Sequence, residues 1–237
     1  MELSTPTTNE TDPRDQKRFY YHATPLRKFL VNFARALFVP LMDMQVSGLE
    51  NFPLEGAAIV AANHVTNFDI FPMQFSLPRP IFYMGKEQLF RNPFTDALFR
   101  NMGAFPVSRD KKDQWAYNHA LKVLAHQQTL GMFPEGTRSR GHGLSVARTG
   151  VARLSIQMNS PIIPMAIVGS DKFFRRDLAT QRLYLRTHVT VNLLTPILPR
   201  PEETAIALTD RVMFSLAAAL PPEMRGVYAD VPKGFGD

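Results

Sequence analysis

After Gly48, short apolar runs alternate along the chain with stretches whose apolar residues recur every three or four positions. The runs have the length of buried strands, and the stretches between them have the periodicity of helices packed on a sheet. The predicted strands are 57–62, 81–84, 130–133, 162–168 and 186–194, and the predicted helices are 94–101, 114–127, 151–158 and 204–219. This alternation predicts an α/β domain with a mixed, largely parallel sheet flanked by helices on both faces.

The composition narrows the chemistry that such a domain can carry. The 237 residues suffice for one large domain, and the absence of cysteine excludes a disulfide scaffold, a cysteine-bound metal and a thiol nucleophile. Six histidines are scattered without ligand spacing, so we expect no metal site. Lysine and arginine number 27 against 21 acidic residues, which favours anionic partners. Because the basic residues are dispersed and form no recognised nucleic-acid module, nucleic acid is not the expected partner.

Both ends of the chain are predicted to differ from the domain, which we place at residues 44–220. Residues 1–16 are polar and predict a disordered lead-in, and residues 221–237 are rich in proline and glycine and predict a loose tail. Residues 17–43 form a segment that is predicted to contain an amphipathic helix, with Thr24 as its N-cap and Pro25 as its first residue. Its apolar stripe comprises Leu26, Phe29, Leu30, Phe33, Ala34, Leu37, Phe38 and Leu41. The pattern alone favours packing on the core over an interfacial membrane anchor. No window approaches 18 uninterrupted apolar residues, so no membrane-spanning helix is expected.

The sharpest local signal is a histidine and a carboxylate, His64 and Asp69, directly after the strand at 57–62. Strand ends in α/β sheets are where ligand sites form. On one continuous helix the two side chains would point about 140° apart, so they can meet only if His64 lies in a turn and Asp69 near the start of the next helix. A carboxylate that holds an imidazole makes it a general base. A capping aspartate beside an unrelated histidine is the simpler alternative, which the spacing alone leaves open.

Two further segments have chemistry suited to phosphate. Residues 133–139, Phe-Pro-Glu-Gly-Thr-Arg-Ser, combine a glycine that permits close backbone approach with hydroxyls and the guanidinium of Arg138. Residues 103–109 end in the basic side chain of Arg109, with Lys111 and Lys112 just after. Taken singly, each segment is equally well explained as an ordinary turn or a solvated charge cluster.

Taken together and in this order, the segments resemble the glycerolipid acyltransferase family and, within it, the lysophosphatidic acid acyltransferases. His64 to Asp69 fits the family's HxxxxD block, 103–109 its second block, 133–139 its FPEGTRS block and 162–166 its proline-centred fourth block. Residues 86–89, Lys-Glu-Gln-Leu, are similar to the basic segment between the first two blocks. The resemblance covers roughly residues 45–172 and implies a glycerol-3-phosphate acyltransferase-like fold.

The resemblance implies transfer of a fatty acyl group from acyl-CoA or acyl-carrier protein to the free hydroxyl of lysophosphatidic acid, giving phosphatidic acid in phospholipid biosynthesis. His64 would remove the proton from the acceptor hydroxyl and Asp69 would orient it. The implied substrate-binding residues are Lys86, Arg109 and Arg138 for the acceptor's phosphate, with Glu135, Gly136 and Thr137 beside them in the turn. No cofactor and no metal are implied, because the acyl donor is itself a substrate.

The resemblance also shifts the interpretation of residues 17–43 towards docking on a membrane surface with anionic lipids, because the acceptor and the product reside in a bilayer. We therefore expect a peripheral enzyme at the cytoplasmic face of the membrane.

Other functions remain as alternatives: an acyltransferase for another lysolipid acceptor, or a non-catalytic lipid-binding protein. A serine hydrolase is disfavoured, because the nearest approach to a G-x-S-x-G elbow, residues 143–147 around Ser145, lacks the last glycine and follows no strand. With neither a thiol nor a serine elbow, we expect the acyl group to pass directly to the acceptor hydroxyl.

Overall fold

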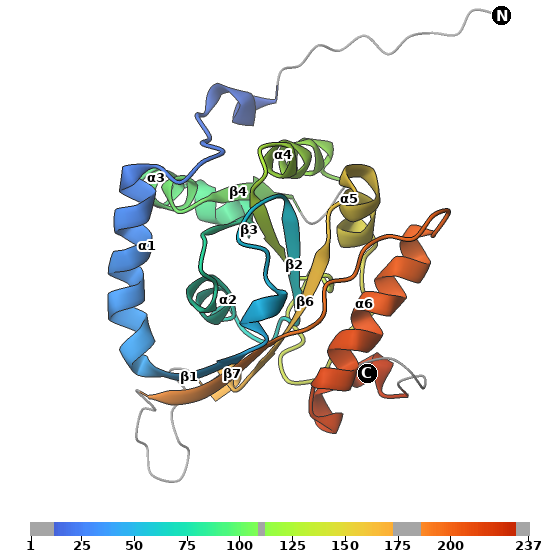
Figure 1. Ribbon diagram of the computed structural model, residues 1–237. Coiled ribbons are helices and arrows are strands. Elements are labelled where there is room, and N and C mark those ends of the chain that lie inside the picture. Colours follow the sequence, from blue (N-terminus) through green and yellow to red (C-terminus); the bar gives the residue numbers. More distant parts are fainter. Residues whose placement is uncertain (1–11, 109–111, 173–185, 231–237) are drawn as a thin grey trace, which may run out of the picture.

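The computed structural model describes residues 12–108, 112–172 and 186–230, and Figure 1 shows helices arranged around one twisted sheet. The strands are β1 (Met42–Ser47), β2 (Ala58–Ala62), β3 (Ile81–Lys86), β4 (Ala104–Val107), β5 (Thr129–Met132), β6 (Ile162–Val168) and β7 (Thr187–Leu193). The α-helices are α1 (Pro25–Phe38), α2 (Ile70–Ser76), α3 (Pro93–Asn101), α4 (Gln114–Ala125), α5 (Gly150–Met158) and α6 (Ala205–Ala219). Short 3-10 helices cover Pro13–Gln16, Val39–Leu41, Leu49–Asn51, Glu87–Phe90, Ser170–Lys172, Pro222–Met224 and Gly226–Tyr228.

The sheet confirms the predicted α/β class. Its strand order is β1-β7-β6-β2-β5-β3-β4, and every neighbouring pair is parallel except β6 with β7. All five residues of β2 are buried, as expected for a central strand covered on both faces, whereas β7 alternates between buried and more accessible positions. Because β2, β5, β3 and β4 are parallel neighbours, their carboxyl ends meet at one edge of the sheet.

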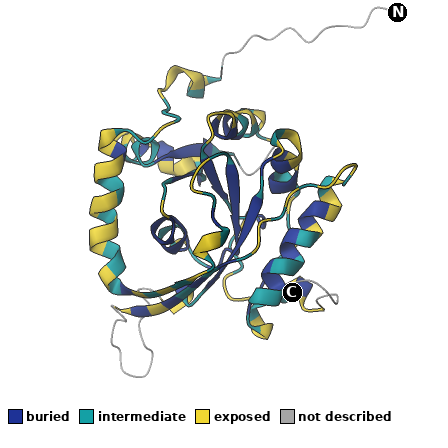
Figure 2. Cartoon of the chain, in the orientation of Figure 1, coloured by how far each residue is buried: buried dark blue, intermediate teal, exposed yellow. Residues whose placement is uncertain are grey.

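Two apolar layers cover the sheet, one on each face, and Figure 2 shows the central strands buried between them. One layer joins the sheet to α4, α5 and α6 through side chains such as Leu124, Leu154 and Leu216. The other joins it to α2 and the inner side of α1 through side chains such as Met73 and Phe38. The segments that follow the central strands are therefore held on a rigid, three-layered scaffold.

Two strands, β1 and β4, were not predicted from the sequence. Strand β4 has only four residues and includes Pro106, and β1 has a single buried residue, Met42, with every second residue exposed. Because β1 begins at Met42 and pairs in register with β7, the predicted domain boundary between residues 43 and 44 is wrong and cuts a strand.

The predicted disordered lead-in is also wrong where the structure describes it. Residues 1–11 lie outside the described residues, but residues 12–16 contain a 3-10 helix. Arg14 forms an ion pair with Asp113 at 2.7 Å, and the Asp113 side chain is only 3% exposed. Because removal of Arg14 would leave the buried Asp113 carboxylate without its cation, this ion pair holds the segment at the start of α4.

The C-terminal segment is ordered as far as the structure describes it. Residues 231–237 lie outside the described residues, whereas Tyr228 is buried and its ring meets Phe214 of α6 edge-on at 5.3 Å. The expectation of a loose tail is therefore wrong for 221–230, because an aromatic side chain anchors this segment in the core.

Helix α1 begins as predicted, with Thr24 Oγ1 accepting a hydrogen bond from the Arg27 backbone N–H at 3.1 Å and Pro25 in first position. Its apolar stripe is largely exposed, whereas the stripe of a helix packed on the core would be buried. Four of its side chains are between 49% and 64% exposed: Leu26, Phe29, Phe33 and Leu37. Arg27, expected outside the stripe, is buried instead, with its guanidinium over the Phe82 ring and donating to the Ile81 carbonyl. Helix α1 thus turns a row of large apolar side chains towards solvent. Within the described ranges, no helix combines the length and apolarity needed to cross a membrane.

Candidate active site

The structure brings His64 and Asp69 together in the manner that their spacing required. His64 lies in the turn after β2, and Asp69 occupies the N-cap position of α2. The Nδ1 atom of His64 lies 2.8 Å from Asp69 Oδ2, and the two side chains are 9% and 0% exposed. The simpler alternative, a capping aspartate with no relation to the histidine, does not fit this contact.

The surroundings of Asp69 determine which ring nitrogen of His64 carries a proton. Asp69 Oδ2 also accepts the backbone N–H groups of Val65 (2.6 Å) and Thr66 (2.9 Å), and Oδ1 accepts the Thr66 hydroxyl. A carboxylate with these donors can only accept from the ring, so Nδ1–H is the donor and Nε2 keeps a free lone pair. This is the tautomer that a general base requires.

The segment at 133–139 holds His64 from two further sides. The Phe133 ring stacks on the imidazole with centroids 3.9 Å apart and planes inclined by 12°. The His64 backbone N–H donates to Glu135 Oε1 at 2.8 Å, and the Ser139 N–H donates to the His64 carbonyl at 2.7 Å. The two sequence blocks therefore form one site in which the second fixes the backbone and the ring plane of the first.

Asn63 contributes to the site, although no role was predicted for it. Its amide makes two hydrogen bonds of 2.8 Å to the backbone N–H and carbonyl of Ile167 in β6. These bonds continue the pairing of β2 with β6 past the last ladder residue, Ala62, and they place His64 at a fixed point beyond the strand. Since 104 positions separate the two partners, no local pattern could have revealed the contact.

The predicted phosphate-binding residues come from neighbouring strand ends. Lys86 is the last residue of β3, and Thr137 and Arg138 follow β5 in the accessible part of the turn. Lys86 and Arg138 are both partly exposed, and the structure gives neither side chain a hydrogen bond or ion pair with another described residue. Arg109 lies outside the described residues.

Glu135 and Gly136 occupy different kinds of position in the same turn. Glu135 is only 3% exposed, and both of its carboxylate oxygens accept hydrogen bonds from the protein, which does not favour the direct substrate contact expected from the sequence. Gly136 has a φ of +65°, and a Cβ there would lie 3.2 Å from the Arg148 side chain. The backbone conformation and the close Arg148 side chain therefore both favour glycine at this turn.

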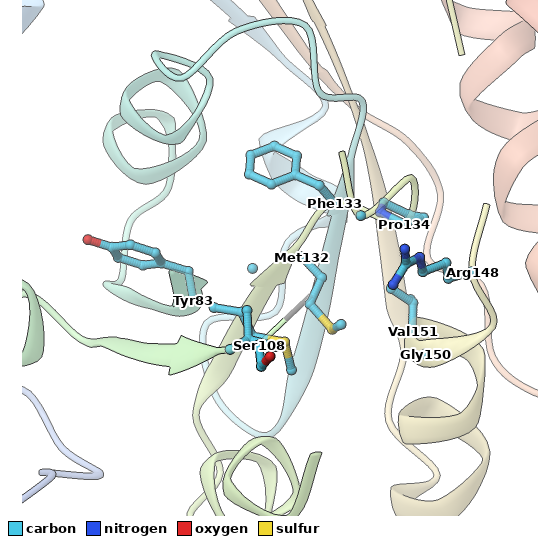
Figure 3. Close-up of a pocket in the computed structure, with 12 residues that line it drawn as sticks. Tyr83, Ser108, Met132, Phe133, Pro134, Arg148, Gly150 and Val151 are labelled. Atoms are coloured by element: carbon cyan, nitrogen blue, oxygen red, sulfur yellow. The ribbon is translucent and has the colours of Figure 1, made fainter. Parts of the chain in front are cut away.

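A pocket of about 160 Å³ lies at the ends of β3, β4 and β5, and Phe133 is one of the residues that line it (Figure 3). Its wall is largely apolar, with Met84, Val107, Met132 and Val151 among the lining residues. Arg148 lies at the α5 side of the pocket, opposite Tyr83, as Figure 3 shows. Burial raises the pKa of Tyr83 to about 12, so its hydroxyl stays neutral. The described residues contain no cluster of three or more metal-ligating side chains.

A largely parallel sheet that carries a carboxylate-oriented histidine at its carboxyl edge, with an apolar pocket and the cations Lys86 and Arg138 at neighbouring strand ends, has the arrangement of an α/β enzyme with a histidine base. The Acyltransferase family model matches residues 43–168, more than half of the chain. The chain therefore belongs to the acyltransferase family, and it is an enzyme of that class.

Three known proteins illustrate the similarity. The chain is 25% identical over 186 residues to the 1-acyl-sn-glycerol-3-phosphate acyltransferase of Borreliella burgdorferi, covering 76% of this chain and 74% of the relative. It is 34% identical over 137 residues to the enzyme of the same name from Salmonella typhimurium, covering 54% of each. The crystal structure of the 1-acyl-sn-glycerophosphate (LPA) acyltransferase from Thermotoga maritima has the same fold, with a TM-score of 0.63, 24% identity, and coverage of 78% of this chain and 74% of that one.

Proposed function

We propose that this acyltransferase moves a fatty acyl group from acyl-CoA or acyl-carrier protein to the free hydroxyl of lysophosphatidic acid, giving phosphatidic acid for phospholipid synthesis. The observation that carries the proposal is the His64 ring, held by Asp69 at Nδ1 and stacked on Phe133, with Nε2 left as the base. The relatives named as 1-acyl-sn-glycerol-3-phosphate acyltransferases support the choice of acceptor.

In the proposed mechanism, His64 Nε2 removes the proton from the acceptor hydroxyl while the hydroxyl oxygen attacks the thioester carbonyl. Asp69 stabilises the imidazolium that forms and keeps the ring in place. Collapse of the tetrahedral intermediate breaks the carbon–sulfur bond, and the imidazolium returns its proton to the departing thiolate. The donor enters as a substrate, so the proposed reaction needs neither an added cofactor nor a metal.

The acceptor and the acyl chain occupy different parts of the proposed site. Lys86 and Arg138, with Arg109 as a third cation, bind the acceptor's phosphate, and Gly136 and Thr137 line its approach. The apolar pocket that Phe133 lines suits the first carbons of an acyl chain, because its wall offers few polar partners.

We also propose that α1 docks the enzyme on anionic lipid at the cytoplasmic face of the membrane. Its exposed apolar row contains Phe29 and Phe33, 64% and 56% exposed, and Lys28 and Arg35 are exposed on the same helix. Burial of such a row in the headgroup region, with lysine and arginine near anionic lipid, is how an interfacial helix binds.

The activity is tested by following free thiol released from acyl-CoA with and without lysophosphatidic acid. We expect release that depends on the acceptor, near-complete loss in His64→Ala, and no loss in the control His142→Ala, which changes an exposed histidine. Release that needs no acceptor would indicate a thioesterase. No release with either CoA or carrier-protein donor would favour the non-catalytic lipid-binding alternative. A panel of lysolipids then separates lysophosphatidic acid from other acceptors.

Membrane docking is tested with the full chain and anionic liposomes in a flotation assay. Phe29→Ser with Phe33→Ser is expected to weaken binding at least tenfold, because two aromatic side chains lose their burial in lipid. The matched control is Ile206→Ser with Val227→Ser, which removes exposed apolar side chains elsewhere. Equal binding by both double variants would contradict the role of α1.

A further inference from the structure

Ser145 lies in the segment 143–147, which does not complete a G-x-S-x-G elbow. It is linked to His64 through the Glu135 carboxylate, whose two oxygens bind the two residues separately. Its backbone N–H and its hydroxyl both donate to Glu135 Oε2, each at 2.9 Å, while Glu135 Oε1 accepts the His64 N–H at 2.8 Å. We infer that Ser145 and Glu135 are positioning residues for His64, forming a bridge that fixes the backbone of the base without touching the substrate. This inference rests on the proposed role of His64.

The bridge is rigid because the carboxylate is buried and both of its oxygens are used. Three N–H or O–H donors converge on one carboxyl group that is 3% exposed, and charge-assisted bonds of this kind are stronger than neutral ones. His64 lies two residues beyond Ala62, the last residue of β2 that pairs with β6, so without Glu135 its buried N–H would lose its partner. A shift of the carboxylate would therefore move the catalytic turn itself.

The arrangement also differs from the serine–histidine pair of a serine hydrolase. Its hydroxyl hydrogen is directed to a carboxylate oxygen of Glu135, and the imidazole of His64 is bonded to Asp69 instead. A serine hydrolase activates its serine with a histidine base, whereas the Ser145 hydroxyl is bonded to a carboxylate that also holds the His64 backbone.

The far end of the bridge is held by the C-terminal segment, which the sequence predicted to be a loose tail. Leu144 N–H donates to the Met224 carbonyl at 2.9 Å, and Val227 N–H donates to the Leu144 carbonyl at 3.0 Å. The Tyr228 hydroxyl accepts the N–H of Ala147 at 3.2 Å. Residues 224–228 thus bind the loop on both sides of Ser145 and set the position of the bridge.

The steady-state test compares Ser145→Ala with Ser47→Ala, a control that also removes one serine hydrogen bond but at an exposed site in β1. We expect kcat to fall about tenfold in Ser145→Ala, because small displacements of a catalytic group have effects of this size, with the KM for donor and acceptor unchanged within about twofold. Tyr228→Phe should lower kcat in the same way but less, and Ser145→Thr, which keeps the hydroxyl, should recover most of the loss. A raised acceptor KM with unchanged kcat would mean that the bridge binds substrate, and unchanged kcat and KM would mean that it has no role; either result overturns the inference.

A second readout does not depend on activity. The bond from His64 N–H to Glu135 predicts slow amide hydrogen exchange at His64 in the wild type and exchange at least about tenfold faster in Ser145→Ala, but not in Ser47→Ala. Unchanged exchange at His64 would refute the bridge. Absent acyl transfer by the wild type would instead refute the proposed function, so the two failures are distinguishable.

Discussion

His119 provides a test of the fold's packing that can be worked through to a number. It lies on α4, 5% exposed, within 5.1 Å between ring centroids of Phe19, Tyr21, Phe105 and Trp115. Burial, with a smaller contribution from Lys122, lowers the pKa of His119 to about 4 from its ordinary value of 6.5. The folded protein therefore keeps this ring neutral at pH values where the unfolded chain protonates it.

The direction in which stability changes with pH follows from proton binding at His119. Between pH 6.5 and pH 4 the unfolded chain binds more protons at this residue than the folded protein does, so stability falls as the pH is lowered. The full effect below pH 4 is about 3 kcal/mol, worked from a pKa of about 4 in the folded protein and 6.5 in the unfolded chain, and about 2 kcal/mol of it is already lost at pH 5.

The measurement is urea unfolding at pH 8 and pH 5 for the wild type, His119→Leu and the exposed-site control His142→Leu. The wild type and the control are expected to lose about 2 kcal/mol more than His119→Leu on going from pH 8 to pH 5, since leucine cannot be protonated. Equal losses in all three proteins would show that His119 is not held neutral by the fold, and the reasoning from burial would be refuted.

Three further predictions concern Asn63, Gly136 and Arg14. Asn63→Leu removes both hydrogen bonds to the Ile167 backbone, so we expect a free energy of unfolding in urea about 2–3 kcal/mol lower and a lower kcat. An unchanged kcat would show that these hydrogen bonds do not position His64. Gly136→Ala forces an alanine to a φ of +65°, which costs about 1–2 kcal/mol and should lower acyl transfer more than stability, measured by thiol release beside a thermal melt. Arg14→Ala leaves the Asp113 carboxylate buried without its cation, and we expect a loss of about 1–3 kcal/mol together with faster limited proteolysis near the N-terminus; cleavage at the wild-type rate would contradict the anchoring role of Arg14.

The exposed face of α1 shows where a local pattern is ambiguous. The periodicity of residues 25–38 identified a helix, and the Thr24–Pro25 start was correct. Periodicity does not say which way a stripe faces, however, and here Phe29 and Phe33 point to solvent while Arg27 is buried. Arg27 can approach the sheet because Gly103 has no side chain: a Cβ there would lie 2.3 Å from its Nη2. The fit between Arg27 and Gly103 depends on two segments that are distant in the sequence, so the pattern of neither segment predicts it.

The sequence by itself determined the α/β class, most of the helices and strands, and the blocks that carry the chemistry. Strand length, helical spacing and turn residues are local properties, and the spacing of His64 and Asp69 already required a turn followed by a helix start. The tertiary structure alone decided how the blocks are assembled: Glu135 binds the His64 backbone across 71 positions, and Asn63 binds β6 across 104. It likewise turned the predicted tail into a support for the Ser145 loop. The physical reason is that hydrogen bonds between distant segments depend on strand order and packing, which no window of sequence contains.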